Sequence, residues 1–308
     1  MSSKRKIYRS GFLHICQKSA DNGILFYTLK DILVIYTLLS VKAVAFEIEV
    51  YAIDIMFNHL HAGVRCSDPK KVAGFMNSTT SVFARLYNKR YNLRGQLFKK
   101  PFNSSPKMNE TRIRDCLFYI WNNPKEKKVA KLAEEYRWNF LRYLDSDHPF
   151  SEPVDMTSAS DNLLKYIRIV ESKRRSGEYL DYSFLDEALK SLEKTECMQL
   201  IDHIIISYDV IERDALMDMF GSYQTLLTAV NAVTGNEYGM KDDYDDEDYR
   251  KYLKMIEITE REGIDLEHER FYRGYFDGQE RLLAMLRSQF KSEARASGYE
   301  IDKFLHLL

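Results

Sequence analysis

The stretch that decides the fold is MFNHLHAGV, residues 56–64. Successive side chains of a strand point to opposite faces, so His59 and His61 share one face, while Leu60 points the other way with the apolar residues that follow. Two imidazoles side by side, backed by an apolar face, can bind a divalent cation. With 7 histidines in 308 residues, a chance His-x-His pair on a surface strand is the competing interpretation.

A second stretch, DCLFYIWNNP at residues 115–124, supplies further candidates. Its apolar residues recur at helical spacing and predict a helix over 112–122: Ile113, Cys116, Leu117 and Ile120. Pro124 disfavours helical geometry at the residue before it, so the helix is expected to end near Asn123. Tyr119 and Asn123 lie four residues apart and share a helix face. That face offers a phenol as nucleophile and an amide oxygen as a third ligand.

Together the two stretches resemble the single-tyrosine HUH transposases, which have the IS200-like transposase fold, and most closely the REP-associated tyrosine transposases. A His-hydrophobe-His strand preceded by Met-x-Asn, and a helix with Tyr-Ile-x-x-Asn-Pro, carry the resemblance, which covers roughly residues 11–143. The segment GQLFKKPF at 95–102 resembles the family's glycine, phenylalanine and basic strand. The chain departs from the family pattern at Phe57 (usually proline), Trp121 (often histidine or tyrosine) and Asn139-Phe140 (two serines).

The resemblance implies a transposase-like endonuclease and strand transferase that cuts and rejoins single-stranded or hairpin DNA through a 5′-phosphotyrosine link. Tyr119 is the implied nucleophile, and His59, His61 and Asn123 are the implied ligands of Mg²⁺ or Mn²⁺. The implied core is a ferredoxin-like or RRM-like antiparallel sheet with helices on it. Whether such a protein works as a monomer or a homodimer stays open.

Basic and aromatic residues alternate at the end of a helix that is predicted from about Ser67 to Tyr91. Such a pattern suits a single strand of DNA, with phosphates on the cations and bases stacked on the rings. A solvated amphipathic face is the alternative. The predicted DNA contacts here and on the following strand, 96–102, are Arg85, Lys89, Arg90, Tyr91, Lys99 and Lys100.

Charge divides the chain in two. Residues 1–145 hold 25 Lys and Arg against 12 Asp and Glu, whereas residues 146–308 hold 20 against 34. This asymmetry suggests a nucleic-acid-binding half joined to an acidic half. We therefore predict an α+β nuclease domain at 1–147, a linker at 148–154, and an acidic all-helical domain of unknown role at 155–308, which could bind a protein partner.

The order of predicted elements supports the α+β class. Strands are expected at 11–17, from 46 onward and through the His pair, and residues 103–106 are expected to form a loop. Seven helices are expected after the linker, at 162–175, 182–194, 196–208, 211–220, 223–233, 245–262 and 266–298.

Four widely spaced cysteines without a CxxC pair argue against a zinc ribbon and a disulfide framework, and fit a reducing cytoplasm. The longest uncharged run of the most apolar region, 32–41, is far shorter than the roughly 20 residues that a membrane helix needs, so no membrane association is expected.

Three alternatives to the nuclease remain. A catalytically decayed or domesticated relative would bind DNA hairpins without cutting them and would carry an acidic protein-interaction domain. The acidic helical half could instead be the main functional part, as a protein-interaction module or a DNA mimic. A purely structural His pair would bind no metal at all.

Overall fold

The computed structural model describes residues 11–20, 25–26, 28–99, 101–232 and 261. The helix predicted at 266–298 lies outside these residues, as does that at 245–262 apart from Arg261.

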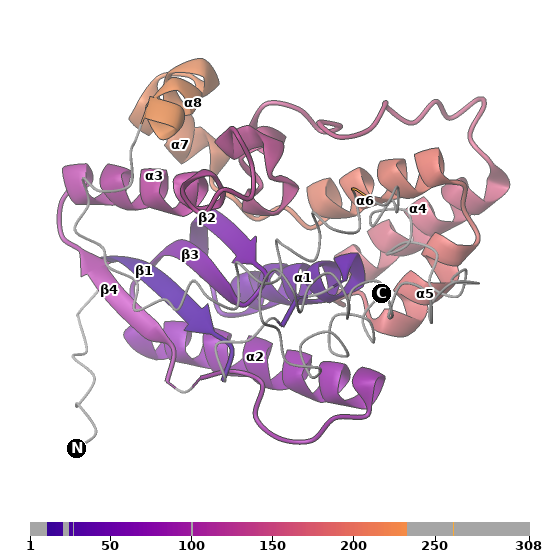
Figure 1. The fold of residues 1–308 in the computed structure, drawn as a ribbon, viewed down its shortest axis with the longest axis horizontal. Coiled ribbons are helices and arrows are strands. Elements are labelled where there is room, and N and C mark those ends of the chain that lie inside the picture. Colours follow the sequence, from indigo (N-terminus) through magenta and orange to yellow (C-terminus); the bar gives the residue numbers. More distant parts are fainter. Residues whose placement is uncertain (1–10, 21–24, 27, 100, 233–260, 262–308) are drawn as a thin grey trace.

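A four-stranded antiparallel sheet forms the centre of the described chain (Figure 1). Its strands are β1 (Gly11–Lys18), β2 (Glu49–Met56), β3 (His59–Cys66) and β4 (Asn103–Lys107), in the spatial order β2-β3-β1-β4. The strand with the His pair is therefore internal, between β2 and β1. The predicted α+β class is confirmed.

Three helices cover the two faces of this sheet. Helices α1 (Leu29–Ala45) and α2 (Pro69–Tyr91) lie on one face, and α3 (Glu110–Glu126) lies on the other (Figure 1). A capping box starts α1, because Thr28 and Asp31 each accept a hydrogen bond from the other's backbone N–H. The His strand is thus packed between helices on both sides.

Beyond α3, the named elements of the described chain are all helical. Three short 3₁₀ turns follow α3, namely η1 (Ala133–Glu135), η2 (Arg137–Asn139) and η3 (Leu141–Leu144). Five helices come next: α4 (Asp161–Arg175), α5 (Tyr182–Lys190), α6 (Lys194–Ser207), α7 (Arg213–Phe220) and α8 (Tyr223–Ala232). The predicted helices in this part of the chain are confirmed to within a few residues.

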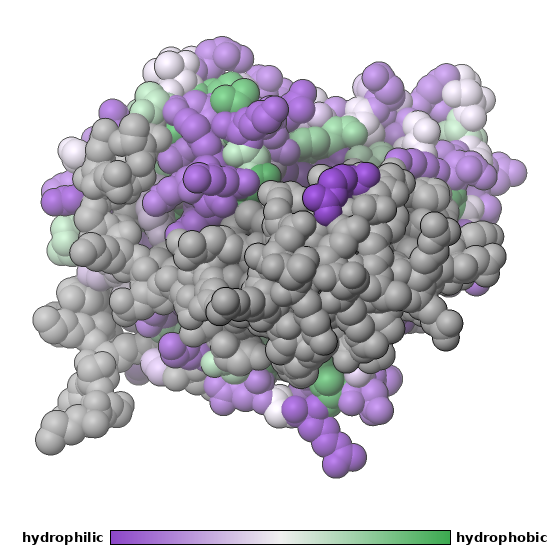
Figure 2. Space-filling model, in the orientation of Figure 1, coloured by the Kyte–Doolittle hydropathy of each residue, from purple (hydrophilic) through white to green (hydrophobic). Residues whose placement is uncertain are grey.

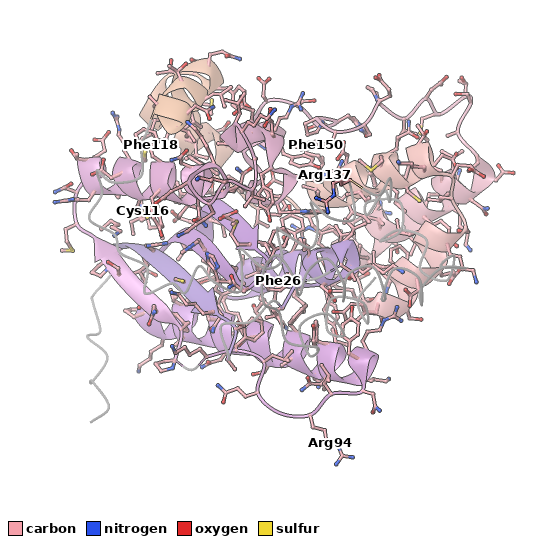
Figure 3. All side chains as sticks on the ribbon, in the orientation of Figure 1. Phe26, Arg94, Cys116, Phe118, Arg137 and Phe150 are labelled. Atoms are coloured by element: carbon pink, nitrogen blue, oxygen red, sulfur yellow. The ribbon has the colours of Figure 1, made fainter. Side chains whose placement is uncertain are left out.

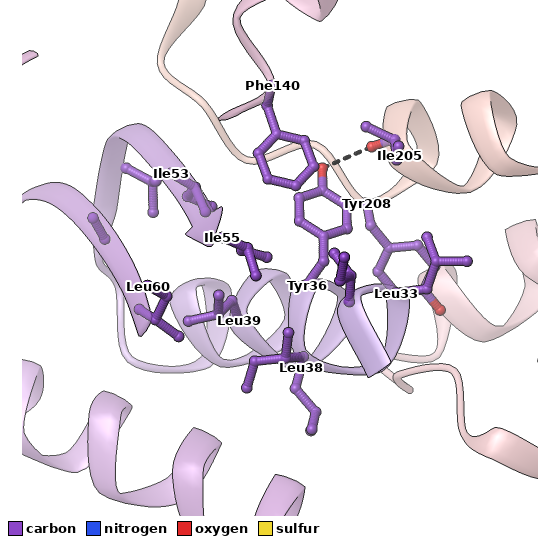
Figure 4. Close-up of a cluster of buried hydrophobic side chains, with 14 of the residues drawn as sticks. Leu33, Tyr36, Leu38, Leu39, Ile53, Ile55, Leu60, Phe140, Ile205 and Tyr208 are labelled. Carbon is purple, nitrogen blue, oxygen red and sulfur yellow. Dashed lines mark hydrogen bonds between the residues drawn. The ribbon is translucent and has the colours of Figure 1, made fainter. Parts of the chain in front are cut away.

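These later helices pack directly on the sheet layer. Figure 4 shows Tyr36 of α1 reaching α6, where its hydroxyl donates to the Ile205 carbonyl at 2.8 Å. The Tyr36 ring also stacks on Phe140, with ring centroids 4.4 Å apart. One continuous hydrophobic core therefore runs from the sheet into the helices after residue 155. The division into two domains at 148–154 stays a prediction.

Helices α7 and α8 lie against the outer side of α3. Figure 3 shows Phe118 on the side of α3 that faces α7 and α8, and Cys116 on the side that faces the sheet. The Phe118 and Phe220 ring centroids are 5.3 Å apart, and the Arg114 guanidinium donates to the Met219 carbonyl at 2.8 Å. The helix that carries Tyr119 is thus held from both sides.

Two local predictions were wrong. The fourth strand is Asn103–Lys107, where a loop was expected, while the described residues of 96–102 form no strand and Phe98 makes an isolated bridge with Ser19. As an edge strand paired only with β1, β4 tolerates Pro106, which lacks an N–H to donate. Helix α3 also continues through Pro124 to Glu126, because proline this close to the end removes only one bond of the ladder.

On the face shown in Figure 2, the coloured residues are mostly hydrophilic. The large exposed apolar residues of the described chain are spaced well apart in sequence: Val44, Leu93, Met108, Leu132 and Met156. All four cysteines are buried free thiols. None of the described helices is long and apolar enough to cross a membrane.

Candidate active site

The α3 side of the sheet carries a row of polar side chains at its centre. In the strand register, His59 lies opposite Lys18 of β1 and Met56 of β2, and His61 lies opposite Cys16 and Asp54. Directly opposite residues of an antiparallel pair share a face, with Cβ atoms about 5 Å apart. Asp54 and both histidines therefore lie together on the face that α3 covers, and all three are buried.

A glycine lets α3 approach this face closely. A Cβ at Gly63 would come within 2.9 Å of the Phe12 ring and 3.3 Å of Leu117 and Ile120. With α3 seated here, the ring of Tyr119 meets His14 and His61 edge-on, with centroid distances of 5.6 Å to each. The predicted nucleophile and one predicted ligand are thus brought together.

Asn123 lies one helical turn beyond Tyr119 and contacts the other end of the row. Its Nδ2 donates to Asp54 Oδ2 at 2.8 Å and lies 3.5 Å from His59 Nε2. Among the described residues, neither Asn123 Oδ1 nor Asp54 Oδ1 finds a hydrogen-bond partner. Two buried oxygen atoms on this face of the sheet are therefore unsatisfied by the described residues.

Hydrogen bonds orient both predicted histidine ligands. His59 Nδ1 lies 2.7 Å from Asn58 Oδ1, and since an amide oxygen only accepts, Nδ1 carries the proton and Nε2 the lone pair. His61 Nδ1 lies 2.9 Å from His14 Nε2, with the two rings stacked. Fixing one ring nitrogen in this way is how metal-binding histidines are usually held.

Burial controls the charge of the row. Burial lowers the pKa of His59 well below its ordinary value, and the nearby His61, Lys18 and Lys127 lower it further. Burial also raises the pKa of the Asp54 carboxyl well above its ordinary value, although the hydrogen bond from Asn123 opposes this shift. His59 is therefore a neutral imidazole at neutral pH, which is the form that binds metal.

The side chains of the row offer donor atoms that suit a divalent cation, although they do not form a closed set of ligands. In the described chain, no three His, Cys, Asp or Glu side chains form a metal cluster by themselves. His59 and Asn123 converge with Asp54, while the His61 ring lies edge-on to His59 with centroids 4.7 Å apart. Imidazole nitrogens mixed with amide and carboxylate oxygens suit Mn²⁺, and the oxygens suit Mg²⁺. The two unsatisfied oxygens support this fit.

The predicted DNA contacts lie elsewhere. Arg85 and Lys89 are exposed on α2, in the layer on the far side of the sheet from α3. Arg90 forms a two-pronged ion pair with Asp186 of α5, at 2.5 and 3.0 Å, and Tyr91 donates to Asp31 at 2.9 Å. Lys99 is exposed, and Lys100 lies outside the described residues. None of these contacts is tested by the structure, and they stay predictions.

Sequence reasoning missed several residues of the site. Asp54 is the clearest, and its signal was present, because it is the one charged residue in the apolar run VYAIDIM at 50–56. His14 is another, because it contacts both His61 and Tyr119. Lys18, opposite His59, was not singled out because the register between β1 and β3 cannot be deduced from either strand alone.

One departure from the family pattern has a structural role. Asn139 stands where a serine is usual, and its Nδ2 donates to the carbonyls of Trp121 and Ala133 at 3.1 and 2.6 Å. Trp121, another departure, is fully buried. The two substituted positions therefore join α3 to the turns that follow it, away from the His row.

Residues 27–123 match the family model described as "Transposase IS200 like", about a third of the chain. The matched segment includes Asp54, both histidines of the pair, Tyr119 and Asn123. The resemblance inferred from the sequence is confirmed over this segment.

A solved structure described as "Structure of the REP associates tyrosine transposase bound to a REP hairpin" is similar to this chain. It is 12% identical, with a TM-score of 0.39, over 45% of this chain and 81% of that one. A likeness at this level supports no functional inference. No protein of curated function matches the chain.

Proposed function

We propose that this protein is a metal-dependent DNA endonuclease and strand transferase that uses Tyr119 as its nucleophile on single-stranded or hairpin DNA. The observation that supports this proposal best is the convergence of α3 on the His strand. Tyr119 meets His61, and Asn123 one turn later meets His59. The match of residues 27–123 to an IS200-like transposase model supports the same chemistry.

In the proposed reaction the Tyr119 hydroxyl oxygen attacks a DNA phosphorus atom. The new O–P bond replaces the bond to the 3′-oxygen of the upstream strand, which leaves with a proton as a 3′-hydroxyl. The product is a 5′-phosphotyrosine link. Because this link is a phosphodiester like the one broken, a 3′-hydroxyl can attack it in reverse and rejoin the strand.

The chain's own residues would position these reactants. His59, His61 and Asn123 would hold Mg²⁺ or Mn²⁺, which when bound polarises the phosphate and reduces its repulsion of an attacking anion. A phenol with a pKa of about 10 is a weak nucleophile at neutral pH, so orientation matters greatly. His14 and His61 flank the Tyr119 ring and fix its place over the sheet.

Positive charge for the DNA backbone is available at two places. Lys18 and Lys127 both act on His59 electrostatically. They are therefore proposed to attract the DNA phosphate that binds at the metal held by His59. Arg85 and Lys89 on the exposed side of α2 are proposed contacts for DNA that extends around the molecule. Such contacts would make binding strongly dependent on salt.

Covalent capture tests the proposal. Single-stranded DNA with a hairpin is incubated with the full chain and Mn²⁺, and the mixture is separated on a denaturing gel. The expected result is a shifted protein–DNA band that is lost in Tyr119→Phe and in His59→Ala. Tyr166→Phe is the matched control, because Tyr166 is a buried tyrosine on α4 that pairs with Glu187, outside the His row.

The outcomes separate the alternatives. A band that survives in Tyr119→Phe would refute the assigned nucleophile. DNA binding without a band on any substrate would favour a decayed hairpin-binding protein, and absence of DNA binding would refute the proposed function altogether.

A further inference from the structure

The strongest unexplained feature of the site is the carboxylate of Asp54. It lies in the middle of β2, in a strand whose neighbouring residues, Ile53 and Ile55, are fully part of the hydrophobic core. Its cross-strand partner is His61, so the carboxylate shares the face of the His pair. A buried charge in an apolar strand costs free energy unless something compensates it.

The hydrogen bonds of the chain compensate Asp54 poorly. From the described residues Asp54 accepts one hydrogen bond, from Asn123, and its Oδ1 has none. Asp202, another fully buried aspartate, accepts from the Tyr143 hydroxyl, the Phe150 N–H and the Ser151 hydroxyl. The hydrogen bonds of Asp202 thus satisfy its buried carboxylate, whereas Oδ1 of Asp54 accepts no hydrogen bond from the described residues.

The surroundings of that acceptor indicate what compensates it. Asn123 Nδ2 sits between two acceptors, Asp54 Oδ2 at 2.8 Å and His59 Nε2 at 3.5 Å. A divalent cation can be bound by a carboxylate and an imidazole at once. If the amide turns by half a rotation, its oxygen joins the same set.

We propose that Asp54 is itself a ligand of the divalent cation, so that β2 contributes a carboxylate to a site otherwise built from β3 and α3. This proposal rests on the metal dependence proposed above. It adds a negative charge and a hard oxygen to two imidazoles and an amide. Such a set binds Mn²⁺ and Mg²⁺ better than the neutral set alone.

Manganese binding by the full chain tests this inference without reference to DNA cutting. Free Mn²⁺ is measured from its electron paramagnetic resonance signal during a titration, for wild type and for Asp54→Asn. We expect wild type to bind Mn²⁺ and the variant to bind it at least about tenfold more weakly, because a charged oxygen ligand is replaced by a neutral one. Asp186→Asn, which removes a partly exposed carboxylate on α5, is the control for net charge and should bind like wild type.

Asparagine at position 54 separates a ligand from a positioning residue. Its amide oxygen can still accept the hydrogen bond from Asn123, so a carboxylate that only orients Asn123 would be replaced without loss. Equal Mn²⁺ affinity in wild type and Asp54→Asn would therefore overturn the proposal.

Thermal unfolding gives a second readout. Without metal, Asp54→Asn should unfold at the same temperature as wild type or higher, because a poorly compensated buried charge has been removed, but it should lose the stabilisation by Mn²⁺. If Asp54→Asn melts at a lower temperature than wild type but is stabilised by Mn²⁺ to the same extent, Asp54 has a structural role and the proposal is overturned. Asp54→Val, which suits a buried strand, repeats the test if asparagine does not fold.

Failure of this inference is distinguishable from failure of the proposed function. If wild type binds no Mn²⁺, the metal site and the role of Asp54 are both refuted. If Mn²⁺ binding depends on Asp54 but no covalent adduct forms, the metal ligand stands and the nuclease does not.

Discussion

Two buried aspartates on opposite sides of the sheet differ greatly in the number of hydrogen bonds that they accept. Asp31 lies at the start of α1, where α1, α2 and α5 meet, and from the described residues it accepts four hydrogen bonds at 2.7–2.9 Å. Asp54 lies under α3 and accepts one from the same part of the chain. Both are fully buried, so solvent does not explain the difference.

The difference teaches how to tell a structural carboxylate from a functional one. Donors from Thr28, Tyr91 and Tyr182 surround Asp31 and fasten three helices together. Around Asp54 the described residues instead supply one donor, from Asn123, beside the imidazole of His61, an arrangement that stabilises the folded chain little by itself. A buried polar group that the fold leaves under-satisfied is a candidate for binding something else.

The largest effect is expected from removing Asp31. Asp31→Ala leaves four donors without their acceptor in a buried place, which should lower the free energy of unfolding by about 3 kcal/mol or more. Urea denaturation measures the loss. Mn²⁺ affinity, measured below the unfolding transition, should stay unchanged. A weaker affinity would contradict the assignment of a structural role to Asp31 and a metal-binding role to Asp54.

A smaller effect is expected from removing one donor of the same cluster. Tyr182→Phe keeps the ring, which packs near Tyr91, and deletes only the hydroxyl that donates to Asp31 at 2.7 Å. Hydrogen bonds to charged groups contribute about 1.5–3 kcal/mol, so the loss should fall at the lower end, since three bonds remain. Urea denaturation beside Asp31→Ala tests this order; an equal loss in both variants would contradict it.

The pH dependence of stability should distinguish Asp54 from its asparagine variant. Burial raises the pKa of Asp54, so the folded state holds a proton that the unfolded state releases above pH 3.8. This contribution is complete below that pH and is lost as pH rises through the raised pKa. In metal-free protein the advantage of Asp54→Asn over wild type should grow with pH, by at most about 1.4 kcal/mol per unit.

Urea midpoints at pH 4.5, 6 and 7.5 in the presence of a chelator would measure this growth. Burial also raises the pKa of Asp31, but that residue is present in both proteins and cancels from the difference. A difference that is constant over this range would show that Asp54 does not titrate as its burial requires.

Local periodicity was enough to predict one half of the site. Alternation along a strand placed His59 and His61 on one face and Leu60 in the core, and helical spacing placed Tyr119 and Asn123 together on α3. These relations depend only on residues within one element. That is why they could be predicted from the sequence.

The remainder depended on pairing between elements. Asp54 joins the site only because the β2–β3 register sets it opposite His61, and no pattern within β2 reveals that register. The sequence NSSPK of β4 resembles a loop, since an edge strand needs few apolar residues and tolerates proline. Long-range pairing therefore limited both the fold and the site predictions.

The smallest expected effect on stability is that of replacing Arg90. The same replacement tests the prediction that Arg90 contacts DNA. Arg90 pairs with Asp186, which Lys30 also contacts. Both partners are partly exposed, so Arg90→Gln should lower the free energy of unfolding by only about 0.2–1 kcal/mol. Arg85→Gln, which removes an exposed cation from the same helix, is the matched control.

Single-stranded DNA affinity of the two variants, measured at several salt concentrations, decides between the roles. If Asp186 holds Arg90 for the fold alone, only Arg85→Gln should weaken binding and reduce the dependence on salt. Equal losses of DNA affinity in both variants would instead show that Arg90 exchanges its ion pair with Asp186 for one with a DNA phosphate. The contact between α2 and α5 would then join DNA binding to the helices that follow the nuclease segment.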